Sequence, residues 1–375
     1  MATQSESTAM RDSPPPIRPG MVRQPLSFVD LACFDCIIDT RSPAEYALDH
    51  IPGAISCPVL NNDERDQVGT LYKQTSRFDA KKLGATLVAR NIANHIETLF
   101  QNKPIKWRPL IYCWRGGARS GAMTHVFRQI GWDAGQLEGG YKQWRASLVL
   151  DLDRLAASIR FIAVCGRTGS GKSRLLDALF AKDAQVLDLE RLAAHKGSVL
   201  GDLPDQPQPS QKRFESTIWA TLSKFDASQP VFVEAESKKI GVLRVPQALI
   251  TKMWTGACVD LATVDPLRVP LLREEYAHLI ANPALLSAKL DCLQGLHTKE
   301  KIAAWHTMVR QAQWDDLVTE LLMAHYDPAY DQSMFRHYVN IGCAERINLD
   351  DIDQTAFGRA ADQAIRYAST FLRPE

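Results

Sequence analysis

Two short stretches of the 375-residue sequence carry residues whose types and spacing could do chemistry. In IYCWRGGARSG, residues 111–121, Cys113 ends an apolar run and precedes two adjacent glycines and two arginines. In VCGRTGSGKS, residues 164–173, glycines lead to Lys172 and Ser173. The first pattern is typical of a reactive thiol in an anion-binding loop, and the second is typical of a loop that binds phosphates.

The cysteine loop is expected to turn from a strand that ends at Cys113 into a helix that begins near residue 120. Gly116 and Gly117 permit the backbone angles of such a tight arc. Successive N–H groups in the arc would then point inward and stabilise a thiolate, which lowers the pKa of the cysteine. Arg115 and Arg119 would add positive charge at the rim. We therefore predict Cys113, Arg115 and Arg119 as the catalytic residues.

Two reactions use a Cys-x5-Arg loop, namely phosphate-ester cleavage and sulfur transfer. A protein phosphatase loop usually has histidine before the cysteine, and Tyr112 stands here. The flanking stretches DTRSPAEYALDHIPGAISCPV (39–59) and LEGGYKQWR (137–145) resemble rhodanese domains, and the resemblance covers roughly residues 27–148. It departs at Asp49, where many rhodaneses have glycine. The resemblance implies that Cys113 carries sulfur or selenium.

The phosphate loop fits the pattern G-x-x-x-x-G-K-S, and it follows an apolar strand and opens a helix, as this motif requires. Its backbone N–H groups would surround a diphosphate, Lys172 would reach the outer phosphate oxygens, and Ser173 could hold Mg²⁺. A P-loop nucleotidase usually adds an apolar strand that ends in aspartate. Here the candidate strand PVFVEAESKKIG ends in two glutamates, and Asp188 is another candidate, so diphosphate binding is better supported than ATP hydrolysis. The predicted binding residues are Gly166, Gly169, Gly171, Lys172, Ser173, Glu234 and Glu236.

Other residues give weaker signals. The sequence CFDC (33–36) has no second cysteine pair, which argues against a four-thiolate zinc site, and the histidines show no ligand spacing, so no resident metal site is predicted. Trp114 could stack on a base but is more simply a packing residue. Basic residues after the second strand could contact phosphates or form a solvated face; these are Lys238, Lys239 and Arg244. Five further cysteines are expected to be small core residues: Cys57, Cys165, Cys258, Cys292 and Cys343.

Strands alternate with helices along the chain, which predicts two α/β units with parallel sheets. The first unit has expected strands at 36–40, 51–59 and 109–113 and helices at 44–50, 81–100 and 120–131. The second has expected strands at 159–166, 184–190 and 230–236, a helix at 171–180 and a mostly helical stretch from 270 to 325. We predict a disordered segment 1–26, a rhodanese-like domain 27–148 and a P-loop domain 155–375 with a helical C-terminal part, with the boundary near 146–158.

The composition is that of an ordinary globular protein, because 45% of the residues are hydrophobic and 23% are charged. The sequence has no apolar run of about 18 residues or more, which a membrane-spanning helix would need. It also has no secretory signal, so a cytoplasmic protein with reduced thiols is expected. The net charge of +1 gives no general basic excess, so a nucleic-acid partner would have to be bound by local patches. No protein partner is indicated.

The two loops occur in one chain with LDLERLAAHKGS (187–198) and VEAESKKIG (233–241) after them. This combination closely resembles the tRNA 2-selenouridine synthase family over nearly the whole chain after residue 26. The resemblance implies replacement of sulfur by selenium at C2 of the wobble 2-thiouridine of certain tRNAs. It also implies geranyl diphosphate, which forms an S-geranyl intermediate, and selenophosphate as the selenium donor.

Chemical reasoning agrees with that implication. Sulfur at C2 leaves poorly as sulfide, whereas alkylation turns it into a thiol-type leaving group, and the diphosphate of the alkyl donor needs a cradle such as residues 166–173. Cys113 would then bind selenophosphate or carry its selenium. Two alternatives stay open: an ATP-dependent rhodanese-type sulfurtransferase that acts on a small molecule or RNA, and a regulatory module with the P-loop as a nucleotide sensor. The Cys113 loop argues against the second alternative, because a sensor needs no thiolate.

Overall fold

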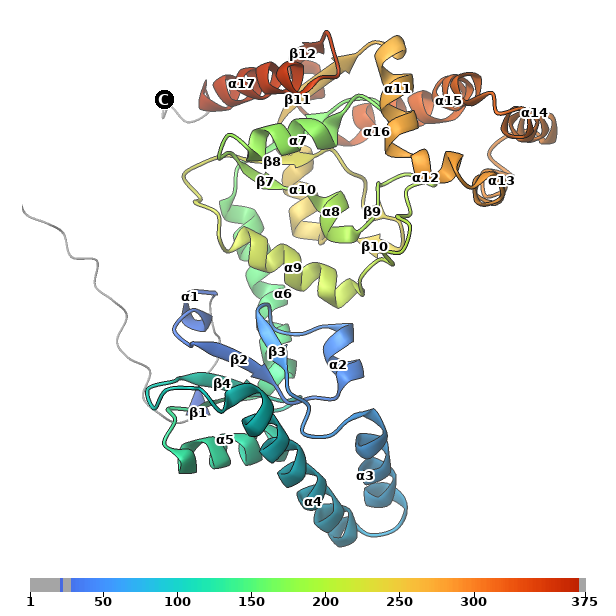
Figure 1. Cartoon of the computed structure of the whole chain (residues 1–375). Helices are drawn as coiled ribbons and strands as arrows, with labels where there is room; N and C mark the ends of the chain where they lie inside the picture. Colours follow the sequence, from blue (N-terminus) through green and yellow to red (C-terminus); the bar gives the residue numbers. More distant parts are fainter. Residues whose placement is uncertain (1–20, 23–27, 371–375) are drawn as a thin grey trace, which may run out of the picture. The chain divides into compact units, whose positions relative to one another are not determined.

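The computed structural model describes residues 21–22 and 28–370, and the chain divides into two compact units (Figure 1). The first unit comprises residues 1–47 and 53–147, and the second comprises residues 48–52 and 148–375. The division at 147–148 falls inside one continuous helix, α6 (Gly140–Ser158). The expected disordered segment 1–26 lies outside the described residues except for Met21–Val22, which form a short strand. The prediction of two α/β units with parallel sheets is confirmed.

The first unit contains a five-stranded sheet with the order β1-β5-β4-β2-β3, in which all neighbours are parallel. Its strands are β1 (Met21–Val22), β2 (Cys36–Asp39), β3 (Ala54–Ser56), β4 (Pro109–Tyr112) and β5 (Gly135–Leu137). The register pairs Asp39 with Tyr112, so both residues stand at the carboxyl ends of adjacent central strands. These ends meet at one edge of the sheet, where the loop that begins at Cys113 also starts.

Helices surround this sheet, because a parallel strand order requires a crossover between neighbouring strands. They are α1 (Phe28–Leu31), α2 (Pro43–Leu48), α3 (Asn62–Gln74), α4 (Arg77–His95) with its π-helical continuation η1 (Ile96–Phe100), α5 (Ala118–Ile130) and α6. Ile38 and Ile111 of the central strands pack against Met123 and Phe127 of α5, and all four are fully buried. This core fixes the start of α5 and therefore the loop between Cys113 and α5.

The second unit contains a parallel sheet with the order β12-β11-β6-β8-β7 and a separate two-stranded hairpin. The strands are β6 (Phe161–Cys165), β7 (Gln185–Leu187), β8 (Val231–Glu234), β11 (Ala257–Thr263) and β12 (Glu345–Leu349), and the hairpin consists of β9 (Lys239–Ile240) and β10 (Leu243–Arg244). Strand β6 lies at the centre and is buried along its whole length, which explains its unbroken apolar sequence. The phosphate loop follows this strand.

The two faces of the second sheet are covered by different helices. On one face, α7 (Lys172–Phe180) and α17 (Gln354–Thr370) pack against β6, β8, β11 and β12 through a core that includes Leu175, Phe357 and Ala361. Another cluster packs Cys165 and Cys258 of the sheet against Trp254, Met334 and Tyr338. The remaining helices around this sheet are α8 (Leu189–Ala193), α9 (Gln211–Leu222) and α10 (Gln247–Thr255).

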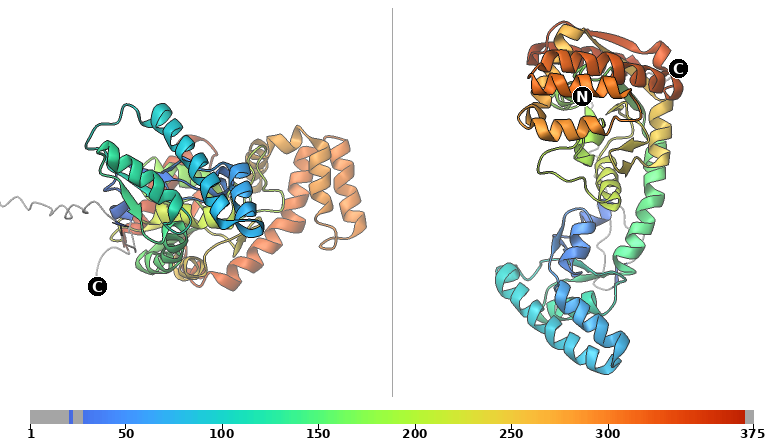
Figure 2. Two further views of the ribbon diagram at one scale, coloured as in Figure 1. Left: turned by 90° about the horizontal axis from the view of Figure 1, so that it is seen from below. Right: turned by 90° about the vertical axis from the view of Figure 1, so that its right-hand side faces the viewer.

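A helical segment lies between β11 and β12, and Figure 2 shows its helices packed side by side. Its members are α11 (Asp265–Glu275), α12 (Ala277–Ile280), α13 (Pro283–Asp291), α14 (Lys299–Arg310), α15 (Trp314–Leu321), the π-helix η2 (Leu322–Tyr326), α16 (Asp327–His337) and the short 3-10 helix η3 (Ile341–Cys343). The expected helical stretch 270–325 falls within it. The C-terminal part is not helical throughout, because the chain returns to the sheet as β12. None of the described helices is long and apolar enough to cross a membrane.

Candidate functional site

Two glycines give the cysteine loop its shape. Gly116 has a φ of +64°, and a Cβ at this position would lie 2.5 Å from the carbonyl oxygen of Leu137. Gly140, from the stretch LEGGYKQWR, has a φ of +57°, and its Cβ would overlap the carbonyl oxygen of Cys113. That same oxygen accepts a hydrogen bond from the N–H of Tyr141 at 2.9 Å. The flanking motif therefore supports the loop by close backbone packing that a larger residue would prevent.

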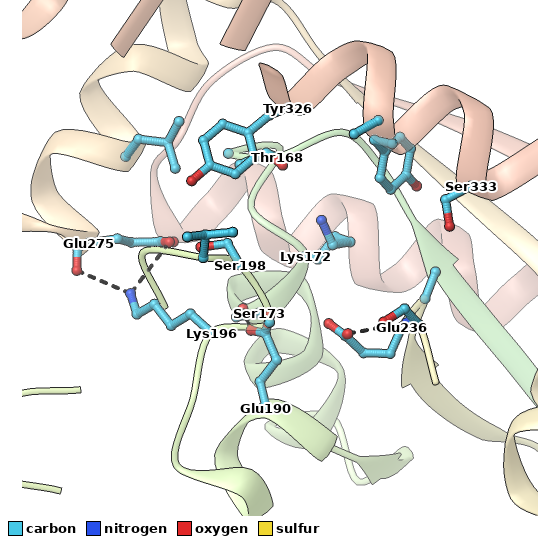
Figure 3. A pocket seen from close by; sticks show the side chains of 18 of the residues that line it. Thr168, Lys172, Ser173, Glu190, Lys196, Ser198, Glu236, Glu275, Tyr326 and Ser333 are labelled. Atoms are coloured by element: carbon cyan, nitrogen blue, oxygen red, sulfur yellow. Dashed lines mark hydrogen bonds and ion pairs between the residues drawn. The ribbon is translucent and has the colours of Figure 1, made fainter. Parts of the chain in front are cut away.

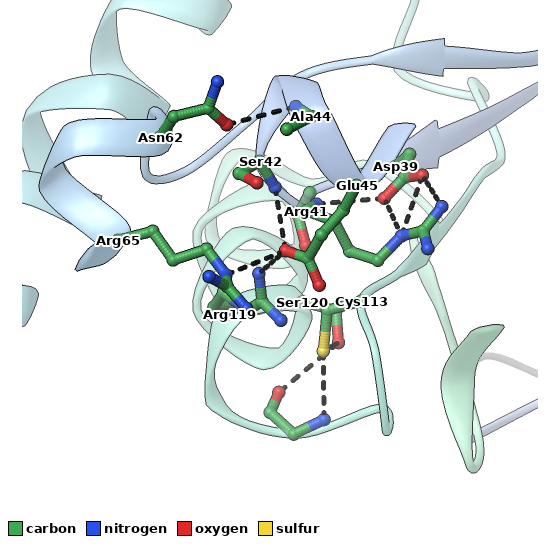
Figure 4. Close-up of polar contacts among 12 residues, drawn as sticks. Asp39, Arg41, Ser42, Ala44, Glu45, Asn62, Arg65, Cys113, Arg119 and Ser120 are labelled. Carbon is green, nitrogen blue, oxygen red and sulfur yellow. Dashed lines mark hydrogen bonds and ion pairs between the residues drawn. The ribbon is translucent and has the colours of Figure 1, made fainter. Parts of the chain in front are cut away.

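The sulfur of Cys113 accepts hydrogen bonds from the residues of its own loop (Figure 4). The N–H of Gly117 and the hydroxyl of Ser120 each donate to Sγ at 3.2 Å. Burial raises the pKa of the thiol, but the hydroxyl of Ser120 and the N–H groups of Ser120, Gly117 and Arg115 outweigh it, so that the pKa of Cys113 lies below its ordinary value. The arrangement can hold a thiolate or bind an anion at the start of α5.

A buried ion pair supports this edge of the sheet from the neighbouring strand. Arg41 donates to Asp39 from Nη2 at 2.6 Å and from Nε at 3.0 Å, and both side chains are almost completely buried. The hydroxyl of Tyr112 donates to the same carboxylate at 2.8 Å, and the guanidinium of Arg41 lies 4.0 Å from the ring centre of Tyr141. The stretch DTRSPAEY therefore has a structural role that sequence alone did not reveal, because it fixes the residue that precedes Cys113.

The two predicted arginines of the loop have different surroundings. Arg119 forms an ion pair with Glu45 at 2.8 Å, and Arg65 contacts the same carboxylate at 3.1 Å (Figure 4). Arg115 is exposed, and its side chain has no hydrogen-bond or ion-pair partner among the described residues. Arg115 is therefore free to meet an incoming anion, whereas Arg119 would first have to share its charge with Glu45. Trp114 stacks on the ring of Tyr141 at 5.4 Å, which favours the packing interpretation.

The phosphate loop connects the central strand β6 with α7. Gly169 and Gly171 have φ values of +77° and +89°, and Gly171 is the residue that precedes the helix. A Cβ at Gly169 would lie 2.7 Å from Leu272, and a Cβ at Gly171 would lie 2.6 Å from Phe357, so both glycines are required sterically. Nζ of Lys172 donates to the carbonyl oxygen of Gly166 at 2.8 Å. The lysine therefore lies across the loop, where phosphate oxygens of a ligand would replace the carbonyl.

A cavity of about 330 Å³ opens beside this loop (Figure 3). Five of the seven predicted binding residues line it: Gly169, Gly171, Lys172, Ser173 and Glu236. Gly166 lies at the base of the loop, where its N–H donates to the hydroxyl of Tyr330. Glu234 lies beneath the cavity at the end of β8, and it is 2% exposed. Oε1 of Glu234 accepts a hydrogen bond from the N–H of Glu190 at 2.6 Å, so its role is to hold α8 in place.

Glu190 is a member of the site that sequence reasoning missed. It lines the cavity together with Glu236, and its Oε2 accepts a hydrogen bond from the hydroxyl of Ser173 at 3.3 Å. A Cβ at Gly197 would lie 2.8 Å from Oε1 of Glu236 and 2.9 Å from Oε1 of Glu190. The quoted stretch LDLERLAAHKGS contains both Glu190 and Gly197, and this stretch was the signal that could have identified them.

Two buried carboxyl groups that lie close together disfavour the state in which both are ionised. Burial raises the pKa of Glu236 well above its ordinary value, Glu190 raises it further, and Lys172 opposes both effects. Burial likewise raises the pKa of Glu190, with Lys172 again opposing. A carboxyl pair with raised pKa values next to a lysine is suited to accept or donate a proton.

Asp188, the other sequence candidate, has a structural role. It is the N-cap of α8, where its side chain accepts from the N–H of Arg191 at 2.7 Å, and it forms an ion pair with the same arginine at 3.2 Å. It does not line the cavity. Among the described residues no group of three or more His, Cys, Asp or Glu has the arrangement of a metal site. A Mg²⁺ ion brought in by a diphosphate would therefore rely on Ser173 and Glu190 together with phosphate and water oxygens.

Further polar and aromatic residues complete the cavity from elements far along the chain. Lys196 is a second lysine at the site, and its Nζ donates to the carbonyl oxygen of Glu275 at 3.1 Å. Four tyrosines line the wall: Tyr276, Tyr326, Tyr330 and Tyr338. Burial raises the pKa of Tyr326 to about 12, so it stays protonated. No local motif predicted these tyrosines, because they come from the helical segment between β11 and β12.

The remaining sequence candidates lie elsewhere. Three basic residues are exposed on and beside the β9–β10 hairpin and do not line the cavity, so contact with phosphates stays a prediction for them: Lys238, Lys239 and Arg244. Of the five cysteines expected in the core, Cys57, Cys165 and Cys258 are buried. The expectation was wrong for Cys292 and Cys343, which are exposed, because each lies at a helix end that faces solvent.

Comparison with known proteins agrees with the two-loop arrangement. A family model described as Rhodanese-like domain matches residues 23–147, and one described as tRNA 2-selenouridine synthase AAA domain matches residues 159–289. The curated tRNA 2-selenouridine synthase of Nitrosomonas europaea is 34% identical over 251 residues, which cover 64% of this chain and 63% of that protein. The alignment with that protein therefore spans a little less than two thirds of its length.

Longer alignments are found with other relatives of the same name. The tRNA 2-selenouridine synthase of Shewanella denitrificans is 31% identical over 328 residues, which cover 80% of this chain and 88% of that protein. The one of Psychromonas ingrahamii is 33% identical, and the alignment covers 71% of each chain. Since such identity extends over both units, the chain belongs to the tRNA 2-selenouridine synthase family.

Proposed function

We propose that this protein is a tRNA-modifying transferase that replaces sulfur by selenium at C2 of the wobble 2-thiouridine. The reaction would use geranyl diphosphate to alkylate the sulfur and selenophosphate to deliver selenium. The observation that carries the proposal is the presence in one chain of two features. One is a cysteine loop whose N–H groups favour an anion, and the other is a P-loop cavity lined by lysines, two carboxyl groups with raised pKa values and several tyrosines. The names of the relatives support the tRNA substrate.

In the first step, the thiouridine sulfur attacks the allylic carbon of geranyl diphosphate. The new C–S bond forms as the C–O bond to the diphosphate breaks, and the base loses its N3 proton to remain neutral. Lys172 and the loop N–H groups bind the departing diphosphate. The pair Glu190–Glu236 lies in the same cavity, where burial raises the pKa of both carboxyl groups, and we assign it as the acceptor of the N3 proton.

In the second step, selenium attacks C2, the C2–S bond breaks and geranyl thiolate leaves and takes up a proton. Water then takes the phosphoryl group from selenium. We assign the binding of selenophosphate to the cysteine loop, where the N–H groups of Arg115, Gly117 and Ser120 favour a negative charge at Cys113. Carriage of selenium as a Cys113–S–Se⁻ group would require a two-electron oxidation, because the selenium of selenophosphate is already at the selenide level. Binding by the loop needs no such oxidant.

The test is mass spectrometry of wobble nucleosides from tRNA incubated with the protein, geranyl diphosphate and selenophosphate. Cys113→Ala should lose 2-selenouridine formation and keep S-geranylation. Lys172→Ala removes a charge-assisted contact, for which we expect a loss of about 1.5–3 kcal/mol, or roughly tenfold to a hundredfold in geranylation. It should still convert tRNA that is already S-geranylated. Normal geranylation by Lys172→Ala, or normal selenation by Cys113→Ala, would contradict the assignment of the two loops.

An ATP-dependent rhodanese-type sulfurtransferase remains the second candidate, because the loop 166–173 has the residues of a nucleotide-binding P-loop. The same assay separates the two. If product forms only when ATP is added and geranyl diphosphate has no effect, the second candidate replaces the first.

A further inference from the structure

A second, smaller cavity lies in the helical segment between β11 and β12. It has a volume of about 60 Å³, and its wall comes from α11, α12, α13, α15 and η2. Its surface is almost entirely hydrocarbon. The apolar lining consists mainly of Leu279, Ile280, Leu286, Leu317, Val318 and Leu322.

This apolar cavity borders the cavity of the phosphate loop. Four residues line both: Thr168, Leu272, Tyr276 and Tyr326. Thr168 belongs to the phosphate loop itself, and Figure 3 shows Thr168 and Tyr326 in the wall of the larger cavity. A ligand whose charged end is held by Lys172 therefore has an apolar space available on the other side of this wall.

We propose that the apolar cavity receives the far end of a short prenyl chain whose diphosphate is bound by the P-loop. This inference rests on the proposed function, in which the P-loop takes an allylic diphosphate. A hydrocarbon chain matches the lining, whereas a nucleobase would need polar partners. Two of the polar side chains at this cavity are already engaged: Arg273 pairs with Asp315 at 2.8 Å, and the hydroxyl of Tyr276 lies 3.3 Å from that of Ser198.

The volume limits the length of the chain. A cavity that holds a single water molecule needs a volume of roughly 10–15 Å³, measured in the same way. The apolar cavity, at about 60 Å³, therefore has space for only a few units of that size. The larger cavity holds the diphosphate and the first isoprene unit, the apolar cavity holds the next one, and a third isoprene unit exceeds this space. Since each buried CH₂ raises affinity about fourfold, the second isoprene unit should increase affinity at least tenfold.

Equilibrium binding to the full chain tests the proposal without any turnover. The ligands are inorganic pyrophosphate, dimethylallyl diphosphate, geranyl diphosphate, farnesyl diphosphate and ATP. We expect geranyl diphosphate to bind at least tenfold more tightly than dimethylallyl diphosphate and more tightly than farnesyl diphosphate. Val318→Phe fills the cavity and should weaken geranyl diphosphate at least tenfold, with pyrophosphate unchanged. Val242→Phe, at a hairpin position that is 82% exposed, is the matched control and should change neither.

The opposite change is made at the same position. Val318→Ala enlarges the cavity and should shift the preference toward farnesyl diphosphate. An unchanged chain-length preference in Val318→Ala overturns the proposal. This outcome can still be read if Val318→Phe misfolds and loses pyrophosphate binding. Chain-length discrimination that Val318→Phe leaves intact would place the prenyl chain elsewhere and leave the proposed function standing. If ATP binds and no prenyl diphosphate binds more tightly than pyrophosphate, the proposed function itself fails.

Discussion

Removal of one hydroxyl next to Cys113 tests how the loop stabilises a thiolate. The hydroxyl of Ser120 donates to Sγ at 3.2 Å, and Ser120→Ala deletes this donor without changing the backbone of α5. The remaining polar contacts of Ser120 are few. Gln136 donates to its hydroxyl at 3.1 Å but also donates to the carbonyl oxygens of Gly116 and Gly117, so Gln136 keeps two acceptors in the variant.

The structure sets the size of the expected effect. A hydrogen bond to a charged group contributes about 1.5–3 kcal/mol, and one pKa unit corresponds to about 1.4 kcal/mol. The lower end applies here, because the N–H of Gly117 continues to donate to Sγ and the hydroxyl of Ser120 also lies 3.3 Å from the carbonyl oxygen of Gly117. We therefore expect the pKa of Cys113 to rise by about one unit in Ser120→Ala.

The assay is the pH dependence of alkylation by iodoacetamide, with each cysteine peptide quantified by mass spectrometry. Peptide resolution is needed because Cys292 and Cys343 are exposed and will also react. The midpoint for Cys113 should lie below the ordinary value of a cysteine thiol in the unmodified protein and move upward in Ser120→Ala. Ser158→Ala, which removes an exposed hydroxyl at the end of α6, should leave the midpoint unchanged. An unshifted midpoint in Ser120→Ala would refute the account of the thiolate.

Four further predictions concern other parts of the molecule. The geranylation rate should rise as the pH passes the raised pKa of the Glu190–Glu236 pair, and Glu236→Gln should lower the rate and flatten this rise. If the pH–rate profile of Glu236→Gln runs parallel to that of the unmodified protein, the pair is not the proton acceptor. Because folding raises the pKa of Glu236, its contribution to stability is present below about pH 4.5 and is lost as pH rises through the folded value, so Glu236→Gln should reduce this loss in thermal unfolding. Asp39→Asn leaves the buried Arg41 without its counter-charge, and hydrogen exchange of β2 and β4 should show an opening free energy lower by about 3–5 kcal/mol; unchanged protection would contradict the role of the pair. Binding of tRNA should weaken with salt in proportion to the phosphates contacted and should exceed binding of a duplex of equal length; a flat salt response in filter binding would remove tRNA from the account.

The sequence predicted those strands whose apolar pattern is visible in consecutive residues. The expected strands 36–40, 109–113 and 159–166 correspond to β2, β4 and β6, because their apolar runs are long enough to mark buried strands. Strands β5, β11 and β12 were not expected. The strand Gly135–Leu137 has three residues, and β12 alternates exposed and buried positions at the edge of its sheet, so neither gives a strong apolar run.

The boundary between the two units also depended on packing that the local sequence does not show. A boundary was expected near residues 146–158, and the two units do divide at 147–148, but the chain runs through this region as the single helix α6. Its apolar residues Leu148, Leu152 and Ala156 are buried at helical spacing. A sequence pattern can mark where one apolar run ends and the next begins, but whether the intervening residues form a loop or a helix depends on what they pack against.

For the two loops, the sequence by itself determined the chemistry that each could offer. The positive φ angles of Gly116, Gly169 and Gly171, the position of Cys113 directly after a strand and that of Lys172 at the start of a helix follow from consecutive residues, since backbone angles and local N–H directions are set within a few residues. Only the tertiary structure decided what surrounds them. It placed Glu190 against Glu236 and set Arg119 against Glu45.

Tertiary structure also joined the phosphate loop to residues more than a hundred positions away. Tyr276 and Tyr326 reach the loop residue Thr168 from the segment between β11 and β12, and the apolar cavity lies beside them. Side-chain contacts of this kind depend on packing of the whole sheet and its helices, which no short motif encodes. The sequence therefore determined which groups can bind an anion or hold a thiolate, and the packing of distant helices decided the charge, the proton and the apolar space that they meet.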